Sequence, residues 1–113
     1  MKTLLIPNLN NKLSCNYFSH IGFSPDQKIP ESELKQKYII EDQNKEIENF
    51  EAELVTFARC PIGFLSEMDT YMANGVDKDK FMMDFKLEHP EVHEETEIAI
   101  YIYRRVCYLG FLN

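Results

Sequence analysis

The stretch YMANGVDKDKFMMDFKLEHPEV, residues 71–92, decides the fold because it encodes two short helices that meet at a hinge. Asn74 and Gly75 supply the left-handed residue that ends the first helix, since glycine has no Cβ to clash in that conformation. Asp77 is placed to cap a second helix over residues 78–88, which the following proline stops. The sequence therefore predicts a helix pair joined by a glycine corner.

Both helices carry apolar side chains at helical spacing. The first is predicted over residues 66–73, because Ser66 and Asp69 have the spacing of a capping box. The apolar positions are Met68, Tyr71 and Met72 in the first helix, with Leu65 just before it at the same spacing, and Phe81, Met82 and Phe85 in the second. We expect the methionines, Met68, Met72, Met82 and Met83, to pack between the helices and a sheet. The alternative is that these adaptable side chains form a partner-binding surface.

Apolar and β-branched runs predict strands on either side of the helix pair. They cover residues 2–6, 37–42, 47–57 and 96–103, while residues 13–23 are interpreted as extended or irregular backbone. In the strand over 47–57 the first half should face solvent on one side and the second half should be buried on both faces. In the strand over 96–103 isoleucines alternate with alanine and tyrosines, so it should be central and covered on both sides.

The order of these elements predicts the fold class. Strands, then a helix pair, then a buried strand favour an α+β fold with an antiparallel sheet or small barrel rather than a parallel doubly wound sheet. We expect the sheet to be closed, and residues 1–113 to form a single domain.

The charge balance limits the partners. The chain has 12 basic and 19 acidic residues, a net charge of −7. Binding to a nucleic-acid backbone depends on Lys and Arg, so this balance argues against sequence-independent binding over a broad surface and leaves only a local basic groove. No apolar run approaches the about 18 residues of a membrane span, and residues 1–7 lack the features of a signal peptide, so we expect a cytoplasmic protein with reduced cysteines and no membrane association.

The C-terminal half resembles a known family. The residues FEAELVTFARCPIGFLSEMDTYMANGVDKDKFMMDFKLEHPEVHEETEIAIYIYRRV, 50–106, are similar to the second half of an ASCH domain, a member of the PUA-like superfamily. The matching elements are residues 52–57, 66–75, 81–85, Pro90 and 98–103. The resemblance implies a PUA-like, mainly antiparallel β pseudobarrel with two short helices before the last strand, and binding of RNA or a nucleotide-like ligand.

The N-terminal half departs from the ASCH pattern. The family usually carries a basic signature of the form G-x-K-x-x-T/E-x-R, and the best candidate in this chain is residues 16–22. The lysine, threonine and arginine positions then fall on Tyr17, His20 and Gly22. Because these three positions depart from the family signature, the resemblance implies a non-catalytic domain. We predict neither a cofactor nor a metal.

One basic and aromatic cluster could bind single-stranded RNA. Arg104 and Arg105 lie among Tyr101, Tyr103 and Tyr108, and arginine pairs with phosphate while tyrosine rings stack on bases. We predict that Lys12, Tyr17, His20 and Lys28 contribute to this ligand site from the opposite wall of a cleft.

Two other functions remain open from the sequence. The first is an acidic protein–protein interaction module, of the kind that mobile elements can encode, directed against a basic partner. The second is a nucleoside or nucleic-acid hydrolase with His20 as general base and Glu67 or a nearby carboxylate as its helper. Cys15 beside His20 would suit a nucleophile, but no third orienting residue accompanies it. The spacing of His89 and His93 would suit a cation, although the proline between them interrupts the helix that such a pair needs.

Overall fold

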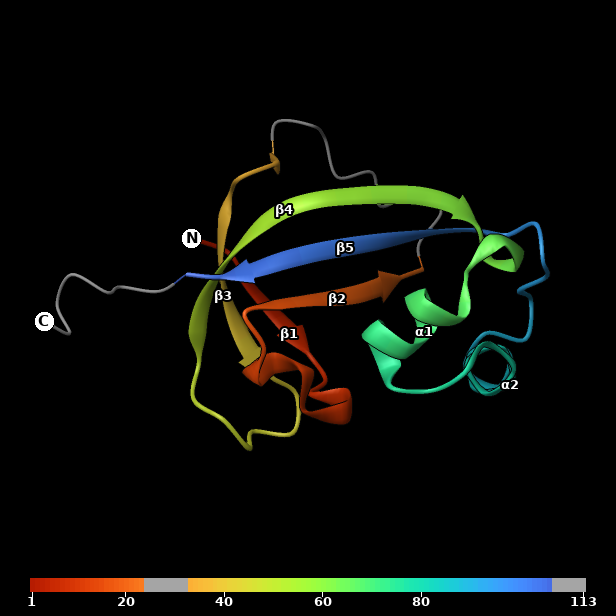
Figure 1. Ribbon diagram of the computed structural model, residues 1–113, viewed down its shortest axis with the longest axis horizontal. Coiled ribbons are helices and arrows are strands. Elements are labelled where there is room, and N and C mark those ends of the chain that lie inside the picture. The colour runs from red at the N-terminus through yellow and green to blue at the C-terminus, as the bar shows by residue number, and fades with distance from the viewer. Residues whose placement is uncertain (24–32, 107–113) are drawn as a thin grey trace, which may run out of the picture.

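The predicted strands and helices are present in the expected order. The computed structural model describes residues 1–23 and 33–106. Its elements are β1 (Thr3–Ile6), β2 (Tyr17–Gly22), β3 (Lys37–Asp42), β4 (Phe50–Pro61), α1 (Glu67–Asn74), α2 (Lys78–Glu88) and β5 (Glu97–Arg105), with short 3-10 helices η1 (Leu9–Ser14) and η3 (Ile62–Phe64) (Figure 1). Neither helix is long and apolar enough to span a bilayer, nor is any other among residues 1–23 and 33–106.

The five strands form one curved sheet in the order β1-β3-β4-β5-β2. β1 runs parallel to β3, and the other three pairs are antiparallel. The α+β class, the mainly antiparallel sheet and the two helices before the last strand are therefore confirmed, and the architecture is that of a PUA-like pseudobarrel.

The expectation of a closed sheet is wrong. Within the described residues β1 and β2 are the two edges and do not pair with each other, so the barrel has an open seam. The chain between them forms η1, which contacts both β2 and α1. η1 consists of two short turns joined at Asn10 and Asn11, whose φ angles are positive, so this segment adds no strand between the two edges.

β5 is the central strand that the sequence predicts. It lies between β4 and β2, and its side chains enter two different cores. Tyr101 and Tyr103 point into the barrel, where they join Phe18 of β2. Ile98 packs on the opposite face against the helices, together with Phe81 of α2. Both faces of β5 are thus covered, as the alternation of its residues indicates.

β4 differs from the prediction in its start and its second half. It begins at Phe50, and its register on β5 shifts between Leu54 and Thr56. Such a bulge inserts one extra residue and reverses the faces that follow it. Val55 is therefore 38% exposed rather than buried, while Phe57 turns toward the barrel core.

The helix ends follow the predicted capping chemistry. Ser66 and Asp69 form a complete capping box at the start of α1, and the Asp77 side chain caps α2. Gly75 ends α1 with a φ of 71°, in the left-handed region. A Cβ at this position would lie 2.5 Å from the Cβ of Asn10, so the corner needs glycine for space as well as for conformation.

The face that α1 buries is not the predicted one. Thr70 and Ala73 are fully buried, whereas Met68 and Met72 are 63% and 48% exposed. The small side chains allow α1 to lie close to β2, and the larger ones then point away from the sheet. The prediction that the methionines pack in the core is therefore wrong for Met68, Met72 and Met83. Met83 is 61% exposed, whereas Met82 does pack against the core.

Candidate ligand site at the seam of the barrel

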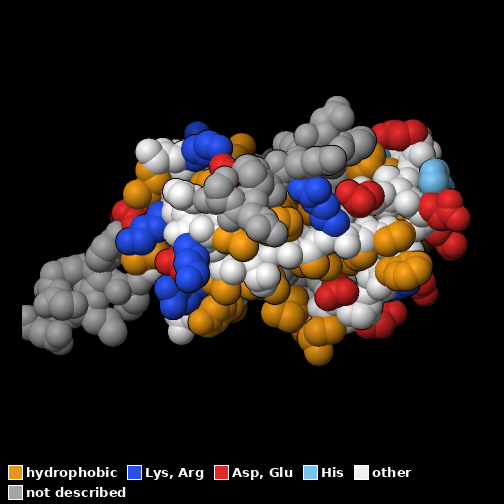
Figure 2. Space-filling model, turned by 90° about the horizontal axis from the view of Figure 1, so that it is seen from above, with side chains coloured by type: hydrophobic (Ala, Val, Ile, Leu, Met, Phe, Trp, Pro, Cys, Tyr) orange, Lys and Arg blue, Asp and Glu red, His pale blue; other side chains and the backbone are white. Residues whose placement is uncertain are grey.

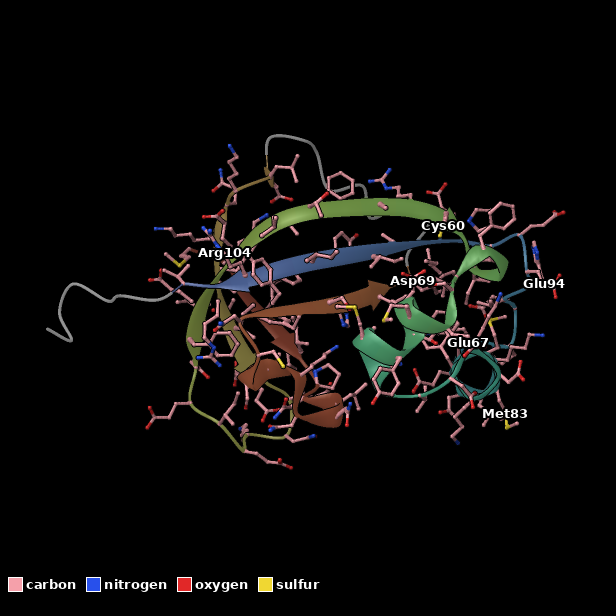
Figure 3. The ribbon with its side chains drawn as sticks, in the orientation of Figure 1. Cys60, Glu67, Asp69, Met83, Glu94 and Arg104 are labelled. Carbon is pink, nitrogen blue, oxygen red and sulfur yellow. The ribbon has the colours of Figure 1, made fainter. Side chains whose placement is uncertain are left out.

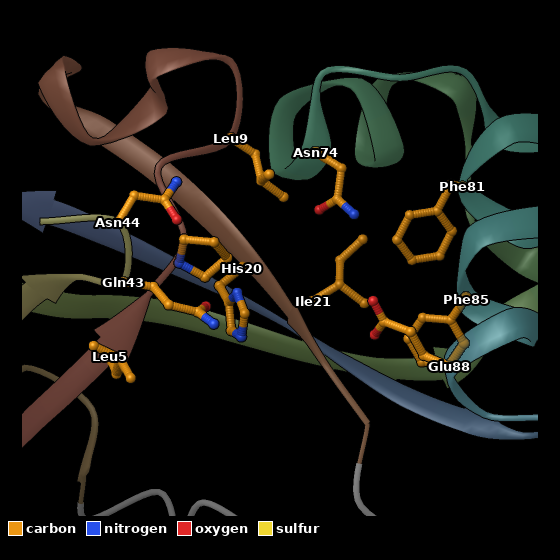
Figure 4. Close-up of a pocket in the computed structure, with 11 residues that line it drawn as sticks. Leu5, Leu9, His20, Ile21, Gln43, Asn44, Asn74, Phe81, Phe85 and Glu88 are labelled. Atoms are coloured by element: carbon orange, nitrogen blue, oxygen red, sulfur yellow. The ribbon is translucent and has the colours of Figure 1, made fainter. Parts of the chain in front are cut away.

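The open seam between β1 and β2 forms a pocket with a volume of about 480 Å³ (Figure 4). It is lined from the two edge strands, from the chain after β3 and from both helices. The lining residues are Leu5, Pro7, Leu9, His20, Ile21, Gln43, Asn44, Asn74, Phe81, Phe85 and Glu88. The pocket exists because the sheet is not closed.

The pocket has two chemically different walls. In Figure 4 the amides of Gln43 and Asn44 lie beside His20 on one side. Phe81, Phe85 and Glu88 of α2 lie on the other side, with Ile21 between the walls. A few polar groups that converge on an apolar cavity are typical of small-ligand sites.

His20 is the titratable group of the polar wall. It pairs with Tyr101 of β5 and so lies on the barrel face of β2. Burial disfavours the imidazolium and lowers the pKa of His20 from 6.5 to about 4, and the nearby Lys12 charge acts in the same direction. At neutral pH the ring is therefore uncharged, with one nitrogen donating and the other accepting.

Lys12 lies beneath the surface as a structural group. Its side chain is only 5% exposed, and its Nζ donates to the carbonyl oxygens of Ser19 at 2.8 Å and Ala73 at 2.7 Å. These bonds tie η1 to β2 and to the end of α1, where the helix dipole favours a cation. Burial lowers the pKa of Lys12 to about 8. Lys12 is close to His20 but does not line the pocket.

Tyr17 and Arg104 lie together, but on a different face from His20. They are direct neighbours in the pairing of β2 with β5, whereas His20 is three residues further along β2 and so points to the other side of the sheet. Tyr17 is 54% exposed, and Arg104 forms an exposed ion pair with Glu53 at 3.4 Å. Figure 3 shows Arg104 at the end of the sheet that is opposite the helices, and Tyr17, its partner in the strand pairing, forms a small surface pair with it there.

Arg105 is held by the protein itself. Its guanidinium lies 3.7 Å from the centroid of the Phe50 ring and donates to the carbonyl oxygen of Leu13. The five predicted site residues that the structure describes therefore do not form one cluster: His20 lines the seam, Lys12 lies behind it, and Tyr17 and Arg104 are on the outer surface. Lys28 and Tyr108 lie outside the described residues.

Alanine substitutions of Arg104 and Arg105 should affect the stability of the protein differently. We expect Arg105→Ala to lower the free energy of unfolding by about 1 kcal/mol, because it removes a cation–π contact and a hydrogen bond. Arg104→Ala should change it by less than about 0.5 kcal/mol, since exposed ion pairs contribute little. Urea denaturation of both variants measures the difference, and equal effects would contradict a structural role for Arg105 that Arg104 does not share.

The hydrolase hypothesis gains no support from the geometry. Glu67 lines a separate groove beside α1, not the seam pocket that holds His20. Cys15 is an exposed free thiol. His89 packs against the rings of Phe23 and Phe85, at centroid distances of 4.9 Å and 4.8 Å. In the part of the chain that the structure describes, no three His, Cys, Asp or Glu side chains are grouped to hold a metal ion.

Sequence reasoning missed most of the pocket lining. Gln43, Asn44 and Asn74 lie in turns or at a helix end. Polar residues are common there because they favour the backbone conformation of turns, so they do not by themselves indicate a binding site. Only the curvature of the sheet, which sets β1 and the chain after β3 across the open seam from β2, brings them to one pocket with His20. The sequence pointed to His20 because the threonine position of the ASCH-like signature falls on it, although His20 departs from that pattern.

The sheet with an open seam and two helices before its last strand has the architecture of a PUA-like pseudobarrel. The crystal structure of protein EF3133 from Enterococcus faecalis V583, described as family DUF984, has a similar fold and superposes on the chain with a TM-score of 0.66. The match covers 94% of this chain and 76% of EF3133 at 14% sequence identity. This similarity concerns the fold. No family model matches the sequence, and no curated protein matches it.

Proposed function

We propose that the protein is an ASCH-type PUA-like domain that binds the base of a nucleoside, free or within RNA, in the seam pocket and does not transform it chemically. The observation that carries this proposal is the pairing of an uncharged polar wall with an aromatic wall in one cavity. A base needs donors and acceptors for its edge and an apolar or aromatic surface for its ring. Gln43, Asn44 and neutral His20 supply the first, and Phe81 and Phe85 the second.

The charges of the pocket favour a base over a phosphate group. Glu88 is the acidic residue of the lining, and no Lys or Arg is among the lining residues that the structure describes. His20 is neutral at physiological pH. A phosphate in the pocket would therefore meet a carboxylate without a compensating cation, which is unfavourable.

Calorimetric titration with the four common ribonucleosides, each paired with its 5′-monophosphate, tests the proposal. We expect at least one nucleoside to bind, and its monophosphate to bind no more tightly. Gln43→Ala and Asn44→Ala should each weaken binding by about 2- to 10-fold, the range for loss of one hydrogen bond. Both side chains are exposed, so these substitutions should leave the fold intact.

Glu48→Ala is the matched control, because this residue is exposed in the same loop but does not line the pocket. It should bind the nucleoside as the unsubstituted protein does. The proposal fails if neither nucleosides nor short single-stranded RNAs bind at millimolar concentration. It also fails if RNA binding is lost with Arg104→Ala and unchanged with Gln43→Ala, because the site would then lie on the outer surface.

A further inference from the structure

The outward face of α1 is apolar and has no partner within the described residues. Met68, Tyr71 and Met72 recur at spacings of three and four residues, and their exposed fractions are 63%, 57% and 48%. A helix on a protein surface normally turns such a stripe toward the core and its polar side toward water. α1 does the reverse, because Thr70 and Ala73 occupy the buried side.

A groove runs beside this stripe where α1 turns into α2. It has a volume of about 470 Å³ and is lined by Glu67, Met68, Tyr71, Gly75 and Asp77. Both carboxylates are fixed by the capping of α2: Glu67 accepts from the Lys78 backbone N–H at 2.9 Å, and Asp77 from that of Lys80 at 2.8 Å. The groove therefore combines an apolar wall with two oriented negative charges, and we name it the α1 groove.

The net negative charge of the protein belongs to the segment of the chain that contains the α1 groove. Residues 62–97, which hold the helices and the turn after them, contain ten acidic and three basic residues. The rest of the chain contains nine of each, so this segment accounts for the whole net charge of −7. In Figure 2 the acidic side chains gather at the right-hand end of the molecule. In Figure 3 Glu67, Asp69 and Glu94 lie at the helical end, away from Arg104.

We propose that the α1 groove is a docking site for a basic amphipathic helix or strand of a partner protein. The apolar residues of that segment contact Met68, Tyr71 and Met72, and its Lys or Arg side chains pair with Glu67 and Asp77. Methionines adapt their shape to such a segment, and tyrosine is enriched at protein interfaces. The surrounding negative field accelerates encounter with a cationic partner.

The same charges exclude the other occupants. RNA would bring phosphates to an acidic surface, which is repulsive. A second copy of this chain on the same face would place two segments of net charge −7 against each other. A basic protein segment is the occupant whose charge and apolar surface are both complementary to the groove.

Fluorescence anisotropy with a labelled amphipathic peptide of Leu and Lys tests the proposal. A scrambled peptide of the same composition and a peptide with Glu in place of Lys serve as comparisons. We expect only the amphipathic basic peptide to bind, and its affinity to fall as the salt rises from about 50 to about 300 mM. Met68→Ser with Tyr71→Ser should weaken binding by about tenfold or more, as loss of central apolar contacts does.

Met83→Ser with Leu87→Ser is the matched control. These side chains are 61% and 77% exposed on α2, and they do not line the α1 groove. This variant should bind the peptide within about twofold of the unsubstituted protein. Equal losses in both double variants would overturn the proposal, since binding would then be non-specific. Absence of binding would also overturn it, as would a dimer in sedimentation that Met68→Ser with Tyr71→Ser abolishes.

Discussion

Phe18→Ala should lower the free energy of unfolding by about 3–5 kcal/mol, the range for deletion of a buried aromatic ring. Phe18 is 2% exposed and lies at the centre of the barrel core. Its ring stacks on Tyr103 at 5.4 Å and meets the edge of Phe50 at 5.9 Å. Alanine would leave a cavity that these rings cannot fill without moving β2 against β5. Chemical denaturation followed by tyrosine fluorescence measures the loss.

Phe64→Ala is the control for this substitution. Phe64 is 79% exposed on η3, so the same chemical change should alter the free energy of unfolding by less than about 0.5 kcal/mol. A loss below about 1 kcal/mol for Phe18→Ala would mean that the barrel interior is not packed around this ring.

Acidification should destabilise the protein through His20. The pKa of His20 is about 4 in the folded state and 6.5 in the unfolded state, so between these pH values only the unfolded chain binds the proton. The stability contributed by the neutral ring is complete above pH 6.5 and falls as the pH falls to 4. A shift of this size corresponds to about 3 kcal/mol, and access of solvent through the pocket reduces the expected loss to about 2 kcal/mol.

His20→Gln isolates this effect from the carboxyl groups that titrate in the same range. Glutamine keeps a polar side chain in the pocket but does not titrate, so the stability of this variant should fall less between pH 6.5 and 4 than that of the unsubstituted protein. Denaturation curves at several pH values give the difference directly. Identical pH dependence of the two proteins would contradict the neutral, buried state of His20.

The two proposed sites can be tested independently. The seam pocket lies between the barrel edges and α2, whereas the α1 groove lies on the outward side of α1. Met68→Ser with Tyr71→Ser should therefore leave nucleoside binding unchanged, and Gln43→Ala should leave peptide binding unchanged. A failure of either proposal does not affect the other.

Local chemistry made the helix pair predictable. The capping residues Ser66 and Asp77 and the corner at Gly75 act through their own backbone neighbours, within one turn of helix. The limits of α1 and α2 could therefore be derived to within about one residue, the usual uncertainty of helix ends. The central position of β5 was equally predictable, because a strand with apolar residues on both faces is buried best at the centre of a sheet.

The candidate sites could not be derived in the same way. The seam pocket brings together groups from β1, β2, the chain after β3 and both helices, and no local pattern relates them. The predicted binding cluster of Arg104, Arg105 and His20 failed to come together for two reasons. Arg104 points to the opposite face of the sheet from His20, and Arg105, which shares the face of His20, lies four residues along β5 from Tyr101, the residue that pairs with His20. The bulge in β4 likewise depends on its partner β5, and its own residues carry no signal of it.

The sequence by itself determined where the helices begin and end, which strand is central, and that the helical segment carries the net negative charge. The tertiary structure alone decided that the barrel stays open at β1 and β2, and that α1 turns Thr70 and Ala73 inward. The physical reason is that capping and hydrophobic periodicity act between residues near in sequence. The choice of buried face depends instead on how closely two elements can approach, and Thr70 and Ala73 allow α1 to lie closer to β2 than its methionines would.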